Sequence, residues 1–195
     1  MKILIDNGHG NNTKGKQSPD GVLREYKYTR EIAERLVDAL RDLGYDAERI
    51  VTEEWDVSIR ERCRRVNAAC ARIGSKNCLL VSIHCNAAGS DGKWYTARGW
   101  SAHVSLNASI KSKTLARCLI NAADQQVLKV RRYDHHAPYW SQNLGICRDT
   151  NCPAVLTENL FMDSRDDVRI LLSEDGKQKI VNTHVCGIIN YINSL

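Results

Sequence analysis

The sequence lacks several features that would assign the protein to a particular class. No apolar stretch approaches the roughly 20 residues needed to cross a bilayer, and no unit repeats at a fixed period. The opening segment MKILIDNGHG has one lysine, a short apolar run that includes an aspartate, and no small-residue cleavage site, so it does not resemble a secretory signal. These absences predict a protein that is synthesised in the cytoplasm and does not insert into a membrane.

The eight cysteines include no C-x-x-C pair, which excludes a zinc ribbon and a thioredoxin-type redox site. Cys63 and Cys70 lie on the apolar stripe of a predicted helix, and Cys78 and Cys85 flank an apolar strand. An even number of cysteines also allows disulfides in an oxidising compartment. We favour buried free thiols, because cysteine is among the residue types most often buried.

The remaining composition is that of an ordinary globular protein. The chain has 195 residues, of which 43% are hydrophobic and 26% charged, and this length favours one domain over residues 1–195. The net charge of +5 suits an anionic partner such as nucleic acid, a membrane surface or an acidic cell-wall polymer. The arginines of residues 59–73 alternate with apolar residues at helical spacing, so they are expected to form a solvated helix face. No aromatic platform accompanies them, and we therefore expect no nucleic-acid partner. We also expect the protein to be a monomer.

Predicted strands and helices alternate along the chain. Strands are predicted at residues 2–6, 45–52, 78–83, 99–106 and 153–159, with a further short strand within 144–148. Helices are predicted at residues 24–43, 58–73, 109–126 and 176–192. This order predicts an α/β fold: a single-domain three-layer sandwich, in which helices cover both faces of a mostly parallel mixed sheet of about six strands.

Four polar residues occupy comparable positions in these elements. His9 follows the first strand, His84 ends the strand LLVSIH, and Glu158 ends the strand AVLTE. Glu25 lies on the inward stripe of the first helix, one turn before its apolar residues begin. The functional site of an open α/β sheet lies outside the carboxyl ends of its strands. We therefore expect the four side chains to converge at one edge of the sheet.

This set of side chains has a defined chemical meaning. Two histidines and a glutamate are a common ligand set of catalytic zinc, which keeps a further position for water. His9, Glu25 and His84 thus fit one zinc ion per chain, and Glu158 fits an acid/base that moves the proton of the water. The spacing is not H-E-x-x-H, so this is not a helix-borne protease site.

Each residue taken singly also has a structural explanation. A histidine in a strand-to-loop turn needs no metal, and a glutamate such as Glu25 at a helix N-terminus is favoured by the helix dipole. A carboxylate that closes a buried strand, as Glu158 does, is costly unless it is paired or functional. It is the joint placement that favours a site.

Over essentially its whole length, the sequence resembles the zinc-dependent N-acetylmuramoyl-L-alanine amidases of the amidase_3 type. ILIDNGHG resembles that family's strand ending in D-x-G-H-G, and LLVSIHCNAA resembles its S-I-H-x-N-A strand. LREYKYTREIAERLVDAL resembles its metal-binding glutamate and the amphipathic helix that follows. RERCRRVNAA resembles its R-x-x-x-x-A-N helix, and PAVLTENLFMDSRDD resembles the segment that carries its catalytic glutamate.

The resemblance implies cleavage of the amide bond between the lactyl group of N-acetylmuramic acid and L-alanine in peptidoglycan. It implies zinc on His9, Glu25 and His84 and catalysis by Glu158. Such a protein would be a phage or prophage endolysin, or an autolysin, that acts in the periplasm or cell wall after release. The alternatives are a zinc amidohydrolase with another N-acyl substrate and a non-catalytic peptidoglycan-binding module.

Three residues are expected to support the site. By resemblance, Asn86 and Arg148 occupy positions where the family often has polar residues near the cleft. Asp6 is a candidate for orienting the imidazole of His9, as carboxylates often do for metal-bound histidine. Cys85 is expected to face away from His84, because adjacent residues of a strand point to opposite faces.

The remaining histidines are assigned other roles. The segment DHHAPYW, residues 134–140, contains two adjacent histidines, which rarely bind one ion together. We expect this segment to line the substrate cleft, since aromatic faces stack on sugars and peptide planes. His103 and His184 are expected to be structural.

Overall fold

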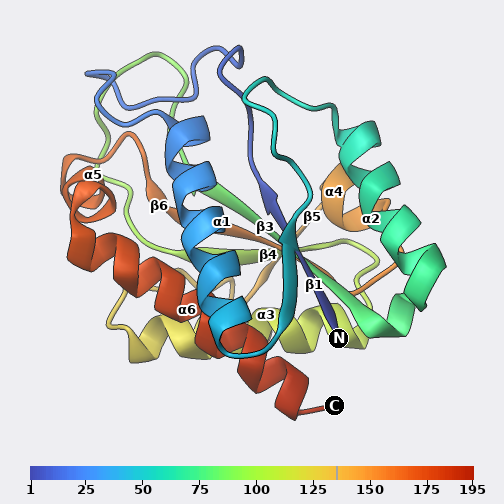
Figure 1. Ribbon diagram of the computed structural model, residues 1–195. Coiled ribbons are helices and arrows are strands. Elements are labelled where there is room, and N and C mark those ends of the chain that lie inside the picture. Colours follow the sequence, from blue (N-terminus) through green and yellow to red (C-terminus); the bar gives the residue numbers. More distant parts are fainter. Residues whose placement is uncertain (135) are drawn as a thin grey trace.

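The computed structural model describes residues 1–134 and 136–195 and has the predicted three-layer α/β architecture (Figure 1). Its central sheet has six strands in the order β2-β1-β3-β6-β4-β5. The strands are β1 (Lys2–Asn7), β2 (Asp46–Arg49), β3 (Cys78–Asn86), β4 (Ser101–Ser105), β5 (Trp140–Gln142) and β6 (Ala154–Phe161). Neighbouring strands among β2, β1, β3 and β6 are parallel, whereas β4 is antiparallel to β6 and parallel to β5. The sheet is therefore mixed and mostly parallel, as predicted.

Helices cover both faces of the sheet. Helices α1 (Glu25–Asp42), α3 (Ile110–Gln125) and α6 (Glu174–Asn193) form one outer layer, in which α6 contacts both α1 and α3. Helices α2 (Ile59–Ile73) and α4 (Gly145–Arg148) form the other layer and contact each other. A short 3-10 helix, η1 (Ser75–Asn77), leads from α2 into β3. Helix α5 (Arg165–Leu172) follows β6 and packs against β6 and α6.

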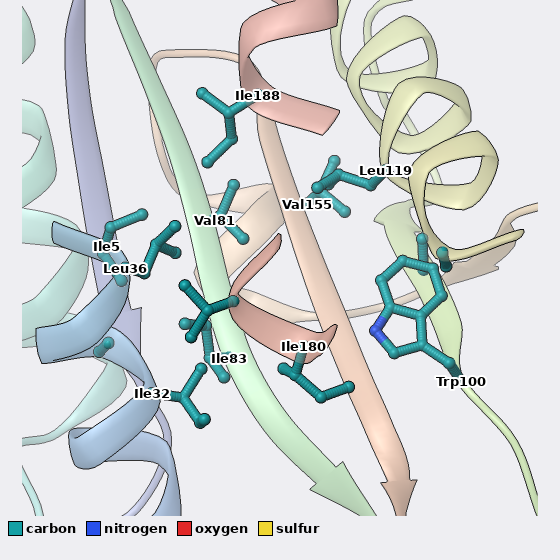
Figure 2. Close-up of a cluster of buried hydrophobic side chains, with 14 of the residues drawn as sticks. Ile5, Ile32, Leu36, Val81, Ile83, Trp100, Leu119, Val155, Ile180 and Ile188 are labelled. Carbon is teal, nitrogen blue, oxygen red and sulfur yellow. The ribbon is translucent and has the colours of Figure 1, made fainter. Parts of the chain in front are cut away.

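The alternation of side chains along the strands divides the interior into two cores. On one face, Ile5, Val81 and Val155 pack against apolar residues of α1, α3 and α6, such as Leu36 and Ile188 (Figure 2). On the other face, a smaller core forms under α2 and α4 from the intervening strand residues. Burial on both faces explains why β1, β3 and β6 are nearly continuous apolar runs in the sequence.

Two segments differ from the sequence-based prediction. The predicted strand within 144–148 is wrong: these residues form helix α4, in which Arg148 N and Asp149 N donate to the carbonyl oxygens of Leu144 and Gly145. The edge strand β5 lies just before it, at Trp140–Gln142. Helix α5, to which the sequence analysis assigned no structure, begins after Ser164. Both are short elements, for which a few apolar residues do not distinguish helix from strand.

The register of the sheet brings two predicted site residues together. His84 of β3 lies opposite Glu158 of β6, and the register shifts just beyond this pair, before Asn86 pairs with Phe161. Residues paired in this way on neighbouring strands point to the same face of the sheet. His84 and Glu158 therefore lie side by side near the carboxyl ends of their strands.

All eight cysteines are free thiols, and most are buried, as predicted. Cys85 belongs to the larger core, which confirms that it faces away from His84. Five others belong to the smaller core: Cys63, Cys70, Cys78, Cys147 and Cys152. Within the described residues, no helix combines the length and apolar character needed to cross a membrane.

Candidate metal centre and catalytic cleft

The structure brings His9, Glu25 and His84 together as a group that can hold a metal ion, with their ligand atoms within 4.8 Å of one another. Glu25 lies between the two imidazoles: its Oε2 is 3.5 Å from His9 Nε2 and its Oε1 is 3.3 Å from His84 Nδ1. Two ligands of one tetrahedral zinc ion are expected about 3.3 Å apart, given bond lengths of about 2.0–2.1 Å. The three side chains come from the turn after β1, the start of α1 and the C-terminal part of β3.

Glu25 is fully buried and only partly satisfied by the protein. Its Oε1 accepts a hydrogen bond of 2.9 Å from Cys85 N, but its Oε2 has no hydrogen-bond partner within residues 1–134 and 136–195. A buried carboxylate oxygen without a donor is unfavourable unless a cation binds it. The orphaned oxygen and the two-histidine, one-glutamate donor set therefore both fit a divalent metal ion.

The turn after β1 is shaped to place His9 against His84. The two rings lie edge to face with centroids 5.0 Å apart. A Cβ atom at Gly8 would lie 2.3 Å from His84 Cε1, and one at Gly10 would lie 2.0 Å from Asp56 N, so both positions require glycine. His9 itself adopts a left-handed backbone conformation, with φ of 61°. Such strain in a non-glycine residue persists where the surrounding structure holds it.

Arg62 of α2 fixes this turn through hydrogen bonds to its backbone. It is 2% exposed, and its Nη1 donates to Asp6 Oδ1 at 2.5 Å and to the Asn7 carbonyl oxygen at 2.6 Å. Its Nη2 donates to the His9 carbonyl oxygen at 3.3 Å. The second oxygen of Asp6 accepts a hydrogen bond from Ser82 Oγ at 2.5 Å. The prediction that Asp6 orients the imidazole of His9 is therefore corrected: Asp6 binds Arg62, and Arg62 in turn holds the backbone of His9.

The electrostatics of the three residues are coupled. Burial lowers the pKa of His9 to about 4, although Glu25 opposes this effect. Burial alone would raise the pKa of Glu25, but the hydrogen bond and charge of His84 outweigh it, and the pKa of Glu25 is lowered. The same contact raises the pKa of His84 against the effect of burial. The carboxylate form of Glu25, which a metal requires, is thus favoured.

Glu158 is a candidate acid/base beside this group. Its Oε2 is buried without a hydrogen-bond partner in the described part of the chain. Burial raises the pKa of Glu158 to about 7, since nearby His84 only partly offsets the loss of water. A carboxyl group with a pKa near neutral is suited both to accept and to donate a proton.

Each member of the His84–Glu158 pair lines a cavity of its own. The first, of about 190 Å³, contains Gly8, His9 and His84 beside the start of α2, and we call it the His9 cavity. The second, of about 310 Å³, is lined by Glu158, Asn86 and residues of β4 and β5, and we call it the Glu158 cavity. The two cavities share no lining residue, and we refer to them together as the cleft.

The other predicted support residues are placed differently. Asn86 lines the Glu158 cavity, as expected. Arg148 lines neither cavity of the cleft; its guanidinium binds Asp149 and Asn143, and the residue borders a separate cavity with Pro153, just before β6. The prediction of Arg148 near the cleft is therefore wrong, because the short helix α4 carries it away from the carboxyl edge of the sheet.

His103 and His184 are hydrogen-bonded to the protein. His184 is fully buried between Thr157 Oγ1, at 2.9 Å, and the Ile180 carbonyl oxygen, at 2.7 Å. Burial lowers its pKa to about 4, so it is neutral. His103 bonds Ser101 and Gln142 and also lines the Glu158 cavity.

The segment 134–140 reaches the cleft through its last residue. Trp140 lines the Glu158 cavity, whereas His135 lies outside the described residues, so its predicted role is not addressed. Sequence reasoning missed Arg131 and Phe161, which line the same cavity. In the sequence, the only indication of their role is that Arg131 lies close to segment 134–140 and Phe161 lies three residues after Glu158.

Comparisons with known proteins agree with this geometry. The family model described as N-acetylmuramoyl-L-alanine amidase (Amidase_3) matches residues 3–190. The chain is 28% identical to the endolysin of Bacillus phage SPP1 over 98% of this chain and 66% of the endolysin. It is 28% identical to the N-acetylmuramoyl-L-alanine amidase CwlM of Bacillus licheniformis over 99% of this chain and 69% of CwlM. The chain thus spans about two thirds of the length of these relatives.

Solved structures share the fold. An N-acetylmuramoyl-L-alanine amidase from Clostridium difficile 630 superposes with a TM-score of 0.83 at 26% identity, over 99% of this chain and 97% of the other. The amidase Ami1 from Mycobacterium smegmatis gives a TM-score of 0.84 at 18% identity, over 100% of this chain and 98% of the other, which supports the fold alone. With the family model matching nearly the entire chain, the protein belongs to the Amidase_3 family of N-acetylmuramoyl-L-alanine amidases.

Proposed function

We propose that the protein is a zinc-dependent hydrolase that cleaves the amide bond between the lactyl group of N-acetylmuramic acid and L-alanine in peptidoglycan. The observation that carries the proposal is the convergence of His9, Glu25 and His84 beside Glu158, the register partner of His84. Family membership supplies the substrate class, and relatives named endolysin and cell wall amidase support action on the wall outside the membrane.

Three residues hold the ion and one moves the proton. His9, Glu25 and His84 provide two imidazole nitrogens and a carboxylate oxygen, the set that suits catalytic zinc. When bound, zinc supplies Lewis-acid chemistry, polarising the scissile carbonyl and acidifying the attacking water. Glu158 accepts the proton of that water at its unpartnered Oε2 and delivers it to the leaving alanine nitrogen. The catalytic unit is a single domain over residues 1–195 that acts as a monomer.

The test is digestion of purified peptidoglycan followed by analysis of the released ends. Free amino termini of L-alanine are expected to accumulate, and to disappear with a chelator and return with added zinc. The Glu158→Gln variant is expected to lose at least about 100-fold in rate, while binding zinc as tightly as the wild type. Lys93→Gln, which changes an exposed side chain, serves as the matched control.

Three results would contradict this function. New reducing ends would indicate cleavage of the glycan strand instead. Hydrolysis of simple N-acyl amino acids without any release of L-alanine termini from the wall would indicate another amidohydrolase. An unchanged rate in the presence of chelator would exclude the metal.

A further inference from the structure

The Glu158 cavity has a composition that the hydrolytic chemistry does not require. Besides Glu158, it is lined by the aromatic rings of Trp140 and Phe161 and by the guanidinium-bearing residue Arg131. The guanidinium carbon of Arg131 lies 4.9 Å from the ring centroid of Phe161 and 5.5 Å from that of Trp140. A cation is thus held between two aromatic faces inside the cleft.

The backbone around Arg131 is built to hold it there. Arg131 N donates to the Trp100 carbonyl oxygen, and Trp100 N donates to the Lys129 carbonyl oxygen, both at 2.7 Å. Gly99 has a φ of 115°, and a Cβ atom there would lie 2.5 Å from the Lys129 oxygen and 3.0 Å from Arg131 Cγ. Glycine at this position therefore permits the close approach that sets Arg131 over the cavity.

Arg131 carries an unneutralised positive charge at the lining of the Glu158 cavity. It has no ion-pair partner among residues 1–134 and 136–195, whereas its neighbour Arg132 pairs with Asp124. His103, the other basic group lining the cavity, is neutral, because burial lowers its pKa to about 4. Its Nδ1 donates to Gln142 Oε1, a carbonyl oxygen that can only accept, so its Nε2 accepts from Ser101 Oγ.

The position of the cavity indicates which part of the substrate enters it. If Glu158 protonates the leaving nitrogen, as the proposed function requires, the released peptide passes Glu158. Glu158 lines the Glu158 cavity, whereas His9 and His84 line the His9 cavity and Glu158 does not. We therefore assign the leaving peptide to the Glu158 cavity. A peptide carries carboxylates unless they are amidated or cross-linked, and a guanidinium binds a carboxylate through two parallel hydrogen bonds.

We propose that Arg131 is a specificity-determining residue, which binds a free carboxylate of the stem peptide on the leaving-group side of the scissile amide. This inference rests on the proposed function. It makes the enzyme selective for stem peptides whose carboxyl groups are free over those in which they are amidated, while Trp140 and Phe161 pack against the peptide.

The test compares two substrates and four proteins. One substrate is N-acetylmuramoyl-L-alanyl-glutamate with free carboxyl groups, and the other has every carboxyl group converted to a carboxamide. The wild type is expected to prefer the first by about 10- to 100-fold in kcat/KM, the range of a hydrogen bond to a charged group. Arg131→Gln should lower this ratio to about one, and Arg131→Lys should retain part of it because lysine keeps the charge without the planar fork. Arg132→Gln removes a neighbouring charge outside the cavity and should behave as the wild type.

The possible outcomes distinguish loss of carboxylate binding from loss of the hydrolytic reaction and from misfolding of the variant. Zinc content and urea unfolding like those of the wild type show that Arg131→Gln is folded and loaded with metal, and this variant should lose less activity on the carboxamide substrate than on the substrate with free carboxyl groups. An equal loss on both substrates, or a ratio near one for the wild type, overturns the carboxylate subsite but leaves the amidase function intact. Failure of the wild type to cleave either substrate overturns the proposed function and the subsite with it.

Discussion

The buried pair Asp6–Arg62 offers a direct test of how the metal site is supported. Asp6 is 1% exposed and Arg62 is 2% exposed, so neither charge is solvated if its partner is removed. Replacing Arg62 with methionine should lower the free energy of unfolding by about 3–5 kcal/mol, because it leaves the Asp6 carboxylate buried and unpaired. Asp6→Asn should cost less, about 2 kcal/mol, since Arg62 keeps its bonds to the carbonyl oxygens of Asn7 and Val57.

The double variant separates the pair from its surroundings. Asp6→Asn combined with Arg62→Met should be less destabilised than the sum of the two, with a coupling of about 2 kcal/mol. Urea unfolding of the metal-free proteins measures this quantity without a contribution from the ion. Arg60→Met, an exposed position on the same helix, is the control and should change stability by less than about 0.5 kcal/mol.

A second measurement connects the pair to the site. Arg62 holds the carbonyl oxygens of Asn7 and His9, so its loss should weaken zinc binding by about 10- to 100-fold, as is typical for residues that support metal ligands. Competition with a zinc chelator provides the affinity. A coupling near zero would refute the buried ion pair as described. Unchanged zinc affinity in a destabilised Arg62→Met protein would refute its role in positioning His9.

Three further predictions concern neighbouring positions. Gly8→Ala should weaken zinc binding by at least about 10-fold, measured by chelator competition, because its Cβ would lie 2.3 Å from His84 Cε1; affinity like that of the wild type would show that the turn adapts. Cys85→Ala should retain full hydrolytic activity, since burial raises the pKa of the Cys85 thiol and the side chain points into the larger core; loss of activity in a folded variant would indicate that the thiol takes part in the reaction. His184 has a pKa of about 4 when folded against an ordinary 6.5, so its stabilising effect is complete above pH 6.5 and is lost as the pH falls toward 4. His184→Gln should reduce the loss of stability between about pH 7 and pH 5 by about 2 kcal/mol in urea unfolding; an unchanged slope would contradict a neutral buried imidazole.

The sequence was most informative where periodicity and topology act together. In the sequence, His9 follows a predicted strand and His84 and Glu158 lie at the ends of two others. Parallel strands bring their carboxyl ends to one edge, so the meeting of these residues could be predicted without coordinates, although β3 and β6 continue to Asn86 and Phe161. Glu25 could be included because helical spacing placed it on the buried stripe of α1. Family resemblance strengthened these predictions, but the convergence itself follows from the order of the elements.

The incorrect and missing predictions concern residues whose positions depend on a short helix or on contacts between segments far apart in the sequence. Arg148 was placed near the cleft by family resemblance, whereas in the structure it belongs to the short helix α4 and binds Asp149 and Asn143. Arg131 was missed because its position depends on hydrogen bonds with Trp100, far away in the sequence, and on the backbone of Gly99. The role of Asp6 was predicted wrongly because its partner, Arg62, belongs to α2, and no local sequence pattern indicates that contact.

The gathering of thiols in the smaller core bears on how long the protein can work once it meets an oxidising environment. In the folded state these thiols are shielded, and burial raises the pKa of Cys78 to about 11 and that of Cys147 to about 12, so little reactive thiolate exists. An unfolded chain exposes all eight cysteines with ordinary reactivity, and cross-links formed there trap it. Outside a reducing compartment, unfolding therefore becomes a one-way step, and the rate of unfolding, rather than the equilibrium between folded and unfolded states, sets the working lifetime.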